Sequence, residues 1–174
     1  VPDTFDLEIE NRIKPCANTK LEGLYLSGGN FCTQCEPEGF RRITYILDRP
    51  DVLSEYTVTV RAPQKNCPVL LSNGNNISSR TLPDGMHEVT WHDPHPKPCY
   101  LFALVGGDLQ HIEDHYTTVS GREVSLRIYA VERDLDQCGH AMDALKKSMH
   151  WDEVRYGREY DLDRFNIVAV EDFN

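Results

Sequence analysis

The chain has 174 residues, 28 of them acidic and 18 basic, which gives a net charge of -10 at pH 7. The basic residues are scattered singly or in pairs, which argues against a nucleic-acid partner, because phosphate binding requires a clustered positive face. A hydrophobic content of 40% with 26% charged residues is typical of a globular protein, and no apolar run is long enough to span a bilayer.

The first part of the chain is rich in short apolar segments that predict strands. Some alternate with polar residues at a period of two, and others are compact apolar runs closed by turn residues. They are residues 5–9, 43–47, 56–61, 69–71 and 100–105. Asn-Gly-Asn at 73–75 and Pro-Asp-Gly at 83–85 predict turns. Many short strands with almost no helical periodicity predict an antiparallel β-sandwich over residues 1–108.

The pattern changes after Asp108. Residues 116–119 and 124–130 predict a hairpin around Ser120-Gly121, and residues 165–173 predict another strand. Between them, five apolar side chains recur at steps of three and four, which places them on one face of a helix. They are Leu135, Cys138, Met142, Leu145 and Met149. Asp134 is the expected helix cap and Gly157 the expected stop.

A hairpin, one helix and a strand make the beginning of an α/β unit over residues 109–174, so the predicted fold is mainly β with this unit at its end. A sheet with one helix and an uncovered edge is an incomplete layer, and the chain begins with Val1 rather than methionine. We therefore expect the natural polypeptide to continue, and we expect an exposed sheet edge near residues 165–173 to permit self-association.

Cys32 and Cys35 have C-x-x-C spacing in the stretch FCTQCEPEGF. A structural zinc site needs four ligands, and the chain holds no second C-x-x-C pair. A redox motif would be expected to open a helix, whereas this one lies among predicted strands. The six cysteines are too dilute for a disulfide scaffold, so we expect reduced thiols and a cytoplasmic location.

Two pairs of histidines are further candidates. His111 and His115 flank Ile-Glu-Asp, which is not the H-E-x-x-H zinc motif, and the absence of helical periodicity predicts an exposed strand or loop. His92 and His95 lie in a stretch with two prolines, which predicts a stiff loop, but three convergent ligands cannot be named.

Gln34 and Glu36 are the remaining candidates. In an extended segment, residues i and i+2 point to the same side, so the amide and the carboxylate can converge on one ligand. Both groups offer acceptor oxygens and one carries a negative charge, which suits an ammonium group. A solvated loop carboxylate is the alternative interpretation of Glu36.

Several long stretches of the sequence resemble the bacterial aminopeptidase N family of gluzincin zinc metallopeptidases. The resemblance runs from about Leu7 to the last residue and includes NTKLEGLYLSGGNFCTQCEPEGFRRITYILDRPDV, SNGN, DPHPKPCYLFALVGGD, MDALKKSMHWDEVRYGREYDLD and IVAVEDFN. It implies that residues 1–108 are part of the N-terminal β-sandwich and that residues 109–174 begin a thermolysin-like catalytic domain.

The resemblance also implies a function and its missing parts. The family removes N-terminal residues from peptides with the help of zinc, and its G-A-M-E-N and H-E-x-x-H motifs would follow Asn174. No catalytic residue and no zinc ligand is then expected in this chain, which should be inactive alone and bind no cofactor. The family's amine-binding glutamine and glutamate match Gln34 and Glu36, so the expected partners are peptide N-termini. The alternative is a stable β-sandwich interaction module without catalysis.

Overall fold

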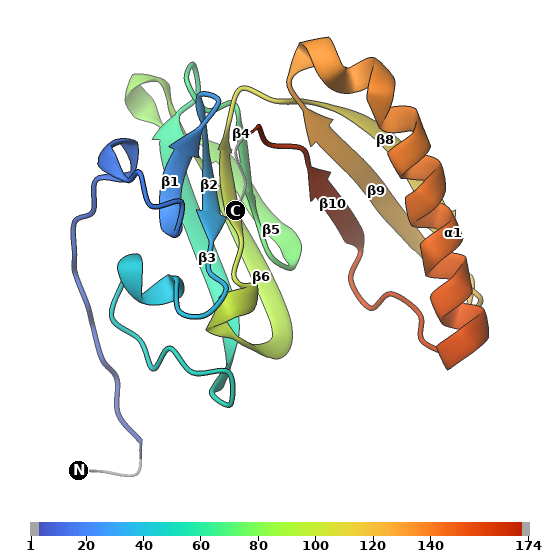
Figure 1. The fold of residues 1–174 in the computed structure, drawn as a ribbon, viewed down its shortest axis with the longest axis horizontal. Coiled ribbons are helices and arrows are strands. Elements are labelled where there is room, and N and C mark those ends of the chain that lie inside the picture. The colour runs from blue at the N-terminus through green and yellow to red at the C-terminus, as the bar shows by residue number, and fades with distance from the viewer. Residues whose placement is uncertain (1–3, 172–174) are drawn as a thin grey trace.

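The structure is a computed structural model that describes residues 4–171. Its elements form two parts, which Figure 1 shows side by side. The first part contains two antiparallel sheets, and the second contains a three-stranded sheet and a long helix. This arrangement confirms the predicted mainly β fold with an α/β unit at its end. Among residues 4–171, none of the helices combines the length and the apolar composition that a membrane span requires.

The two sheets of the first part have antiparallel neighbours throughout. The four-stranded sheet has the order β1 (Gly23–Ser27), β2 (Asn30–Gln34), β7 (Leu104–Gly107) and β4 (Val69–Ser72). The three-stranded sheet has the order β3 (Leu53–Pro63), β6 (Met86–Pro98) and β5 (Asn75–Thr81). Trp91 of β6 links the sheets, because its indole Nε1 donates a hydrogen bond to the Leu70 carbonyl of β4 at 3.1 Å.

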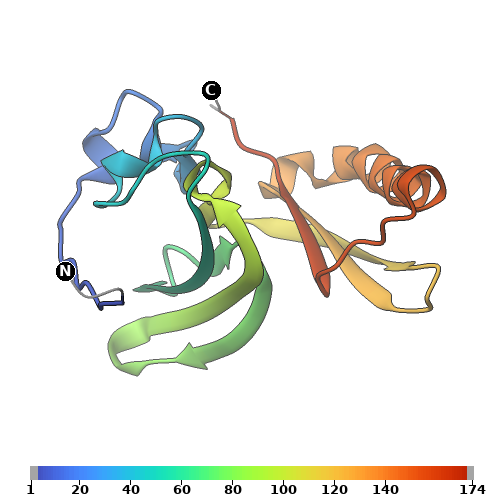
Figure 2. The ribbon, with the colours of Figure 1, turned by 90° about the horizontal axis from the view of Figure 1, so that it is seen from below.

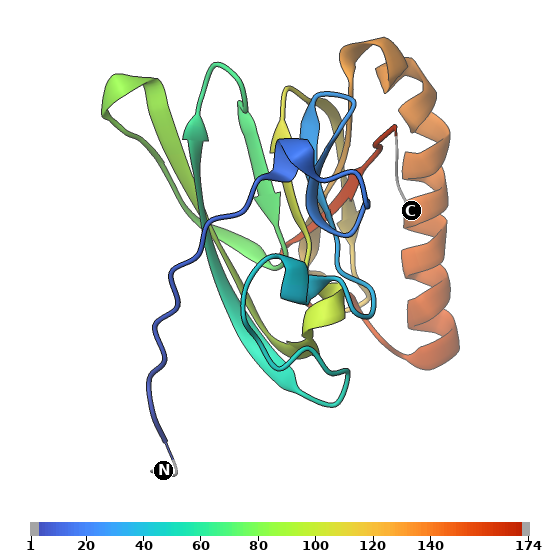
Figure 3. The same ribbon diagram turned by 60° about the vertical axis from the view of Figure 1, so that its left-hand side comes forward.

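Two predicted strands are wrong. Residues 5–9 belong to no strand, and Figure 3 shows them running along the outside of the first part. Residues 43–47 follow the short 3-10 helix η2 (Phe40–Arg42), and Tyr45 is 78% exposed. Alternating or apolar side chains favour a strand, but a strand also needs a neighbour that pairs with its backbone. Neither segment has such a neighbour among residues 4–171.

Both predicted turns are confirmed. Gly74 lies between β4 and β5 with φ of +86°, and a Cβ there would lie 2.1 Å from the His92 carbonyl oxygen. Only glycine fits this close approach at positive φ. Pro83–Gly85 forms the short 3-10 turn η3 between β5 and β6, with Asp84 and Gly85 both at positive φ. The run at residues 100–105 is divided between η4 (Cys99–Leu101) and the start of β7.

The second part has the sheet order β10-β9-β8. Its elements are β8 (Gln110–Thr117), β9 (Glu123–Ala130), the 3-10 helix η5 (Glu132–Gln137), α1 (Cys138–Tyr156) and β10 (Arg164–Val168). The predicted hairpin is confirmed as β8–β9, which pairs antiparallel, but the predicted bounds 116–119 of its first strand are wrong, because β8 ends at Thr117 and the turn begins at Thr118. β10 pairs parallel to β9. Figure 2 shows α1 lying along one face of this sheet.

The predicted helix face is confirmed, because four of its five residues are buried against β9. Cys138, Met142, Leu145 and Met149 pack with Val124, Leu126, Ile128 and Ala130. Gly157 ends the helix in the left-handed conformation, as predicted. Asp134 is not the cap: it lies in η5, which precedes the helix, and Gln137 occupies the cap position without a side-chain hydrogen bond.

The last predicted strand is shorter than expected. β10 ends at Val168, and the Ala169 amide makes one further bond, to the Tyr129 carbonyl at 2.8 Å. Residues 172–173 of the prediction lie outside the described residues. Because β9 is the only described strand that pairs with β10, the opposite edge of β10 is unpaired in the described part of the chain.

A hydrophobic cluster joins the two parts. Leu71 and Trp91 of the first part pack with Leu109 and Tyr129, and Val168 of β10 lies against them. Asp108, the last residue of the first predicted domain, lies between β7 and β8. The division of the chain into domains at this residue stays a prediction.

The C-terminal half of α1 is fastened to the β8–β9 hairpin by a buried carboxylate. Glu153 is 8% exposed, and it accepts hydrogen bonds from the Tyr116 hydroxyl at 2.5 Å and the Val119 amide at 3.3 Å.

Tyr116→Phe is expected to lower the free energy of unfolding by about 1–3 kcal/mol, because it leaves a buried acceptor without its donor. Urea denaturation measures this. Tyr45→Phe, at an exposed ring, is the matched control, and equal losses in both variants would contradict the role of the bond.

Candidate functional site

Gln34 and Glu36 lie at the end of β2, where the chain turns. β2 ends at Gln34, and residues 36–39 form a turn in which the Gly39 amide bonds the Glu36 carbonyl at 2.9 Å. The prediction that this segment is extended through Glu36 is wrong, because the chain turns at residues 36–39. The backbone amide of Glu36 donates a hydrogen bond to the Gln34 side-chain oxygen at 3.4 Å, which links the two residues. Glu36 is exposed and Gln34 is half-buried.

Gly39 allows this turn to fold back on β2. A Cβ at position 39 would lie 2.6 Å from the Gln34 carbonyl oxygen and 3.1 Å from the Cys35 Cα. Both atoms belong to the backbone, so a side chain at position 39 would push the turn away from the strand. The glycine thus keeps the backbone of the turn that carries Glu36 close to the end of β2.

The cysteines of the C-x-x-C pair point into the protein. Cys35 is 1% exposed and packs with Phe40 and Cys99. Burial, followed by the nearby Cys99 and Asp48, raises the pKa of the Cys35 thiol to about 12, and burial also raises the pKa of Cys32. Metal binding and redox attack need the thiolate, which is scarce at neutral pH when the pKa is this high. These environments favour a packing role.

Asp48 binds residues that lie beneath the turn, a role that was not predicted from the sequence. Its carboxylate is 7% exposed and accepts hydrogen bonds from the Arg41 amide and guanidinium, both at 3.0 Å, and from the Cys99 thiol at 3.1 Å. Burial opposes ionisation of Asp48, but the bonds from Cys99 and Arg41 outweigh it and lower its pKa. The only sequence signal was its presence within a stretch that resembles the aminopeptidase family.

Because folding lowers the pKa of Asp48, the free energy of unfolding depends on pH. The ionised form is favoured by folding, so its contribution is present above the pKa of the unfolded chain, about 3.9, and is lost as the pH falls through the lower folded pKa. We expect Asp48→Asn to flatten the fall in unfolding free energy below about pH 4. Urea denaturation between neutral pH and pH 3 measures this, with exposed Asp152→Asn as the control. An unchanged acid slope in Asp48→Asn would contradict the assignment.

The two histidine pairs do not form metal sites. His111 and His115 are exposed on β8, which confirms the predicted exposed strand. His92 and His95 lie within β6, so the predicted stiff loop is wrong, because the prolines are accommodated in the strand. The two rings have different partners: His92 bonds the Thr57 hydroxyl at 3.1 Å, and His95 lies 3.4 Å from Asp161. Within residues 4–171, no group of three His, Cys, Asp or Glu residues is arranged to hold a metal ion.

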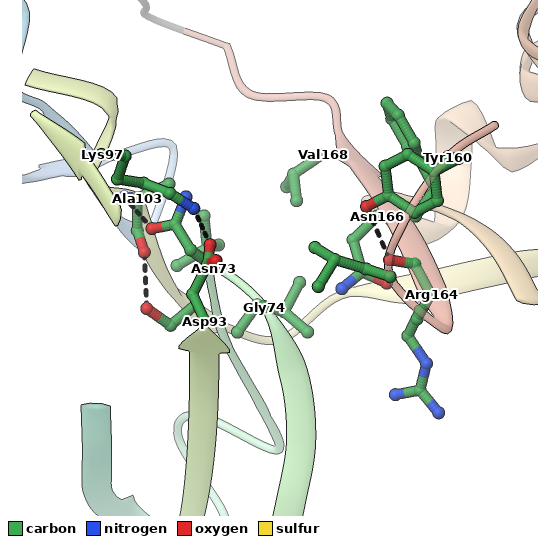
Figure 4. A pocket seen from close by; sticks show the side chains of 14 residues that line it. Asn73, Gly74, Asp93, Lys97, Ala103, Tyr160, Arg164, Asn166 and Val168 are labelled. Carbon is green, nitrogen blue, oxygen red and sulfur yellow. Dashed lines mark hydrogen bonds and ion pairs between the residues drawn. The ribbon is translucent and has the colours of Figure 1, made fainter. Parts of the chain in front are cut away.

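A cavity of about 310 Å³ lies between the two parts of the structure. Figure 4 shows Asn73, Asp93 and Lys97 on one side, and Tyr160, Asn166 and Val168 on the other. Asp93 is 1% exposed and forms an ion pair with Lys97. Asn73 stabilises the neighbouring loop with two hydrogen bonds. Its side-chain oxygen accepts from the Ala103 amide at 2.6 Å, and its side-chain nitrogen donates to the Leu101 carbonyl at 3.0 Å. Gln34 and Glu36 do not line this cavity. The cavity itself was not predicted from the sequence.

Comparison with known proteins identifies the family. The family described as the peptidase M1 N-terminal domain matches residues 2–101. The chain belongs to the peptidase M1 family. Aminopeptidase N of Escherichia coli is 56% identical over 174 residues, which are 100% of this chain and 20% of that protein. Aminopeptidase N of Caulobacter vibrioides is 56% identical over 173 residues, 99% of this chain and 20% of that protein.

A solved M1 relative has the same fold. The crystal structure of Legionella pneumophila aminopeptidase A in complex with aspartic acid superposes with a TM-score of 0.86 and 44% identity. It covers 90% of this chain, and the match is 18% of that chain. The chain therefore spans about a fifth of the length of the M1 relatives that it matches.

Proposed function

We propose that this chain is the part of an M1 aminopeptidase that binds the α-amine of peptide substrates through Gln34 and Glu36. The observation that carries the proposal is the exposed residue Glu36, whose backbone amide bonds the Gln34 side-chain oxygen, at a turn that Gly39 holds against β2. The names of the relatives, which are aminopeptidases, support it.

This pair of side chains suits an ammonium group. The carboxylate and the amide oxygen are both acceptors, and the carboxylate supplies the opposite charge. Holding the amine at one place fixes the distance from the substrate's N-terminus to the first peptide carbonyl. A peptide whose amine is blocked lacks the positive charge, so this arrangement selects for removal of single residues from the N-terminus.

Zinc, on which the family depends, does not fit the residues described here. Residues 4–171 hold no suitable ligand group, so we assign zinc binding to the larger part of the M1 polypeptide and derive no catalytic step from this chain. The proposed contribution of the chain is substrate recognition alone. All six cysteines are free thiols, which supports the further proposal of a cytoplasmic location.

The activity of chains of two lengths tests the proposal. The 174-residue chain and a polypeptide extended to the length of the relatives are compared on an alanyl chromogenic amide and on its N-acetylated form, with zinc present. We expect only the extended protein to hydrolyse the amide, and we expect acetylation to abolish the reaction. Turnover by the short chain, or equal turnover of the acetylated substrate, would contradict the assigned role.

The unpaired edge of β10 favours a second proposal, that the isolated chain self-associates or serves as an interaction module. Light scattering over a range of concentrations tests it. A monomer at the highest concentration would count against association through this edge.

A further inference from the structure

Helix α1 has a second ordered side, opposite the side that packs on β9. Four exposed residues follow one another along it at steps of three and four, which places them together on the helix surface. Figures 1 and 2 show this side of α1 turned away from the sheet that the helix covers. We call the four residues, with one exposed arginine beside them, the outer stripe: Ala144, Lys147, Trp151, Val154 and Arg155.

The outer stripe exposes large apolar side chains. Trp151 is 55% exposed and Val154 is 71% exposed. The ring of Tyr156 contacts the Trp151 ring edge-on, which restricts the indole on the helix surface. A single exposed apolar side chain is common on proteins, but tryptophan, tyrosine and arginine are the residues enriched at the energetic centres of interfaces. The outer stripe therefore has the composition of a docking surface.

The cations of the outer stripe are not neutralised. No ion pair within residues 4–171 includes Lys147 or Arg155. Asp143 and Asp152, the exposed acids of α1, form no ion pair in the same range either. The stripe thus presents positive charge around Trp151 in a chain whose net charge is -10. A partner with acidic side chains around an apolar centre complements this surface.

A second copy of the chain and a lipid surface are less suitable occupants. If two copies of α1 met antiparallel at Trp151, Lys147 of one copy would lie near Arg155 of the other, because each is four residues from Trp151. These like charges would repel one another. An anionic membrane attracts the stripe, but it repels the rest of a chain with a net charge of -10.

We propose that the outer stripe packs against an acidic amphipathic helix from the part of the M1 polypeptide that lies outside these 174 residues. Apolar side chains of that helix contact Trp151 and Val154, and glutamates or aspartates beside them pair with Lys147 and Arg155. Steps of three and four favour a helix as the occupant, because side chains at this spacing interdigitate with those of a second helix. The chain is 20% of two M1 relatives, so the remaining sequence is ample for such a helix.

Fluorine NMR of 5-fluorotryptophan tests the proposal, because the chain has two tryptophans and Trp91 is only 2% exposed. Trp151→Phe assigns the Trp151 signal in the 174-residue chain and in a polypeptide extended to the length of the relatives. A soluble gadolinium chelate should broaden this signal in the short chain, and at least about fivefold less in the extended polypeptide, because the centre of an interface excludes solvent. Equal broadening in the two chains would overturn the proposal.

Charge reversal tests the acidic character of the occupant. In the extended polypeptide, Lys147→Glu should restore the broadening of Trp151 and lower the urea midpoint, because the new glutamate repels the acidic helix. In the 174-residue chain it should leave the midpoint nearly unchanged. Lys65→Glu, at an exposed lysine in the turn after β3, makes the same change in charge and should have neither effect. Equal effects of the two variants, or of Lys147→Glu in the two chain lengths, would contradict an acidic occupant.

The same fluorine signal distinguishes the other occupants. Protection of Trp151 that rises with the concentration of the 174-residue chain would overturn the proposal in favour of a second copy. Protection in the extended polypeptide that requires added phosphatidylserine vesicles would overturn it in favour of a membrane surface.

Discussion

Glu36→Gln in an M1 polypeptide extended from this chain is expected to lower kcat/KM for an alanyl amide by about 30- to 4,000-fold. This range corresponds to about 2–5 kcal/mol, the cost of removing one partner of a desolvated charge pair. Glutamine keeps the size and the acceptor oxygen of the side chain but removes the charge, so the substrate ammonium would lose its counterion. Steady-state kinetics with alanyl and other aminoacyl amides measure the effect.

Glu38 offers a matched control for this change. It lies two residues later in the same turn and pairs with Arg41 at 3.1 Å, with its side chain 60% exposed. An exposed ion pair contributes little, so we expect Glu38→Gln to change kcat/KM by no more than about threefold. A loss in Glu38→Gln as large as that in Glu36→Gln would place the amine site elsewhere.

Trp91→Ala is expected to lower the free energy of unfolding by about 3–5 kcal/mol, the usual range for a buried aromatic residue. Trp91 is 2% exposed and belongs to the cluster that joins the two parts of the structure. The substitution also leaves the Leu70 carbonyl without its indole donor. Because the cluster spans both parts, we expect them to unfold less cooperatively in the variant, which urea denaturation followed by two spectroscopic probes would detect.

Trp151→Ala is the control for this loss. Trp151 is 55% exposed on α1, and its ring contacts the Tyr156 ring edge-on, with the ring centroids 5.3 Å apart. Its removal should cost about 1 kcal/mol or less, the scale of an exposed aromatic pair. Similar losses in both variants would show that the cluster around Trp91 does not hold the two parts together.

The sequence predicted elements well where side-chain pattern and backbone pairing agree. The spacing of Met142, Leu145 and Met149 identified the buried face of α1, and the alternation in residues 124–130 identified the buried face of β9. Residues 5–9 alternate just as clearly, yet Phe5 is 63% exposed. The pattern reports which side chains could be buried together, but not whether another strand lies beside them.

The candidate site was predictable only in its local part. Gln34 and Glu36 are two residues apart, so a contact between them was expected, although the extended geometry was wrong; their proposed role came from the family resemblance. Asp48 and Cys99 are separated by 51 residues, and their meeting beneath the turn depends on the fold. The parallel pairing of β10 with β9 depends in the same way on the fold, and the sequence does not specify its register. Charged residues on separate strands gave no signal that they would meet.

The position of β7 in the first sheet has a consequence for biosynthesis. β7 lies between β2 and β4, and its pairing of Gly106 with Phe31 closes a long loop of chain. Pairings this distant in sequence form slowly, because the entropy of loop closure is lost before their contacts stabilise the fold. During synthesis, the edge of β2 that pairs with β7 stays unpaired until β7 has left the ribosome. The turn that carries Glu36 is therefore synthesised early, but it is expected to become ordered only after β7 has paired with β2.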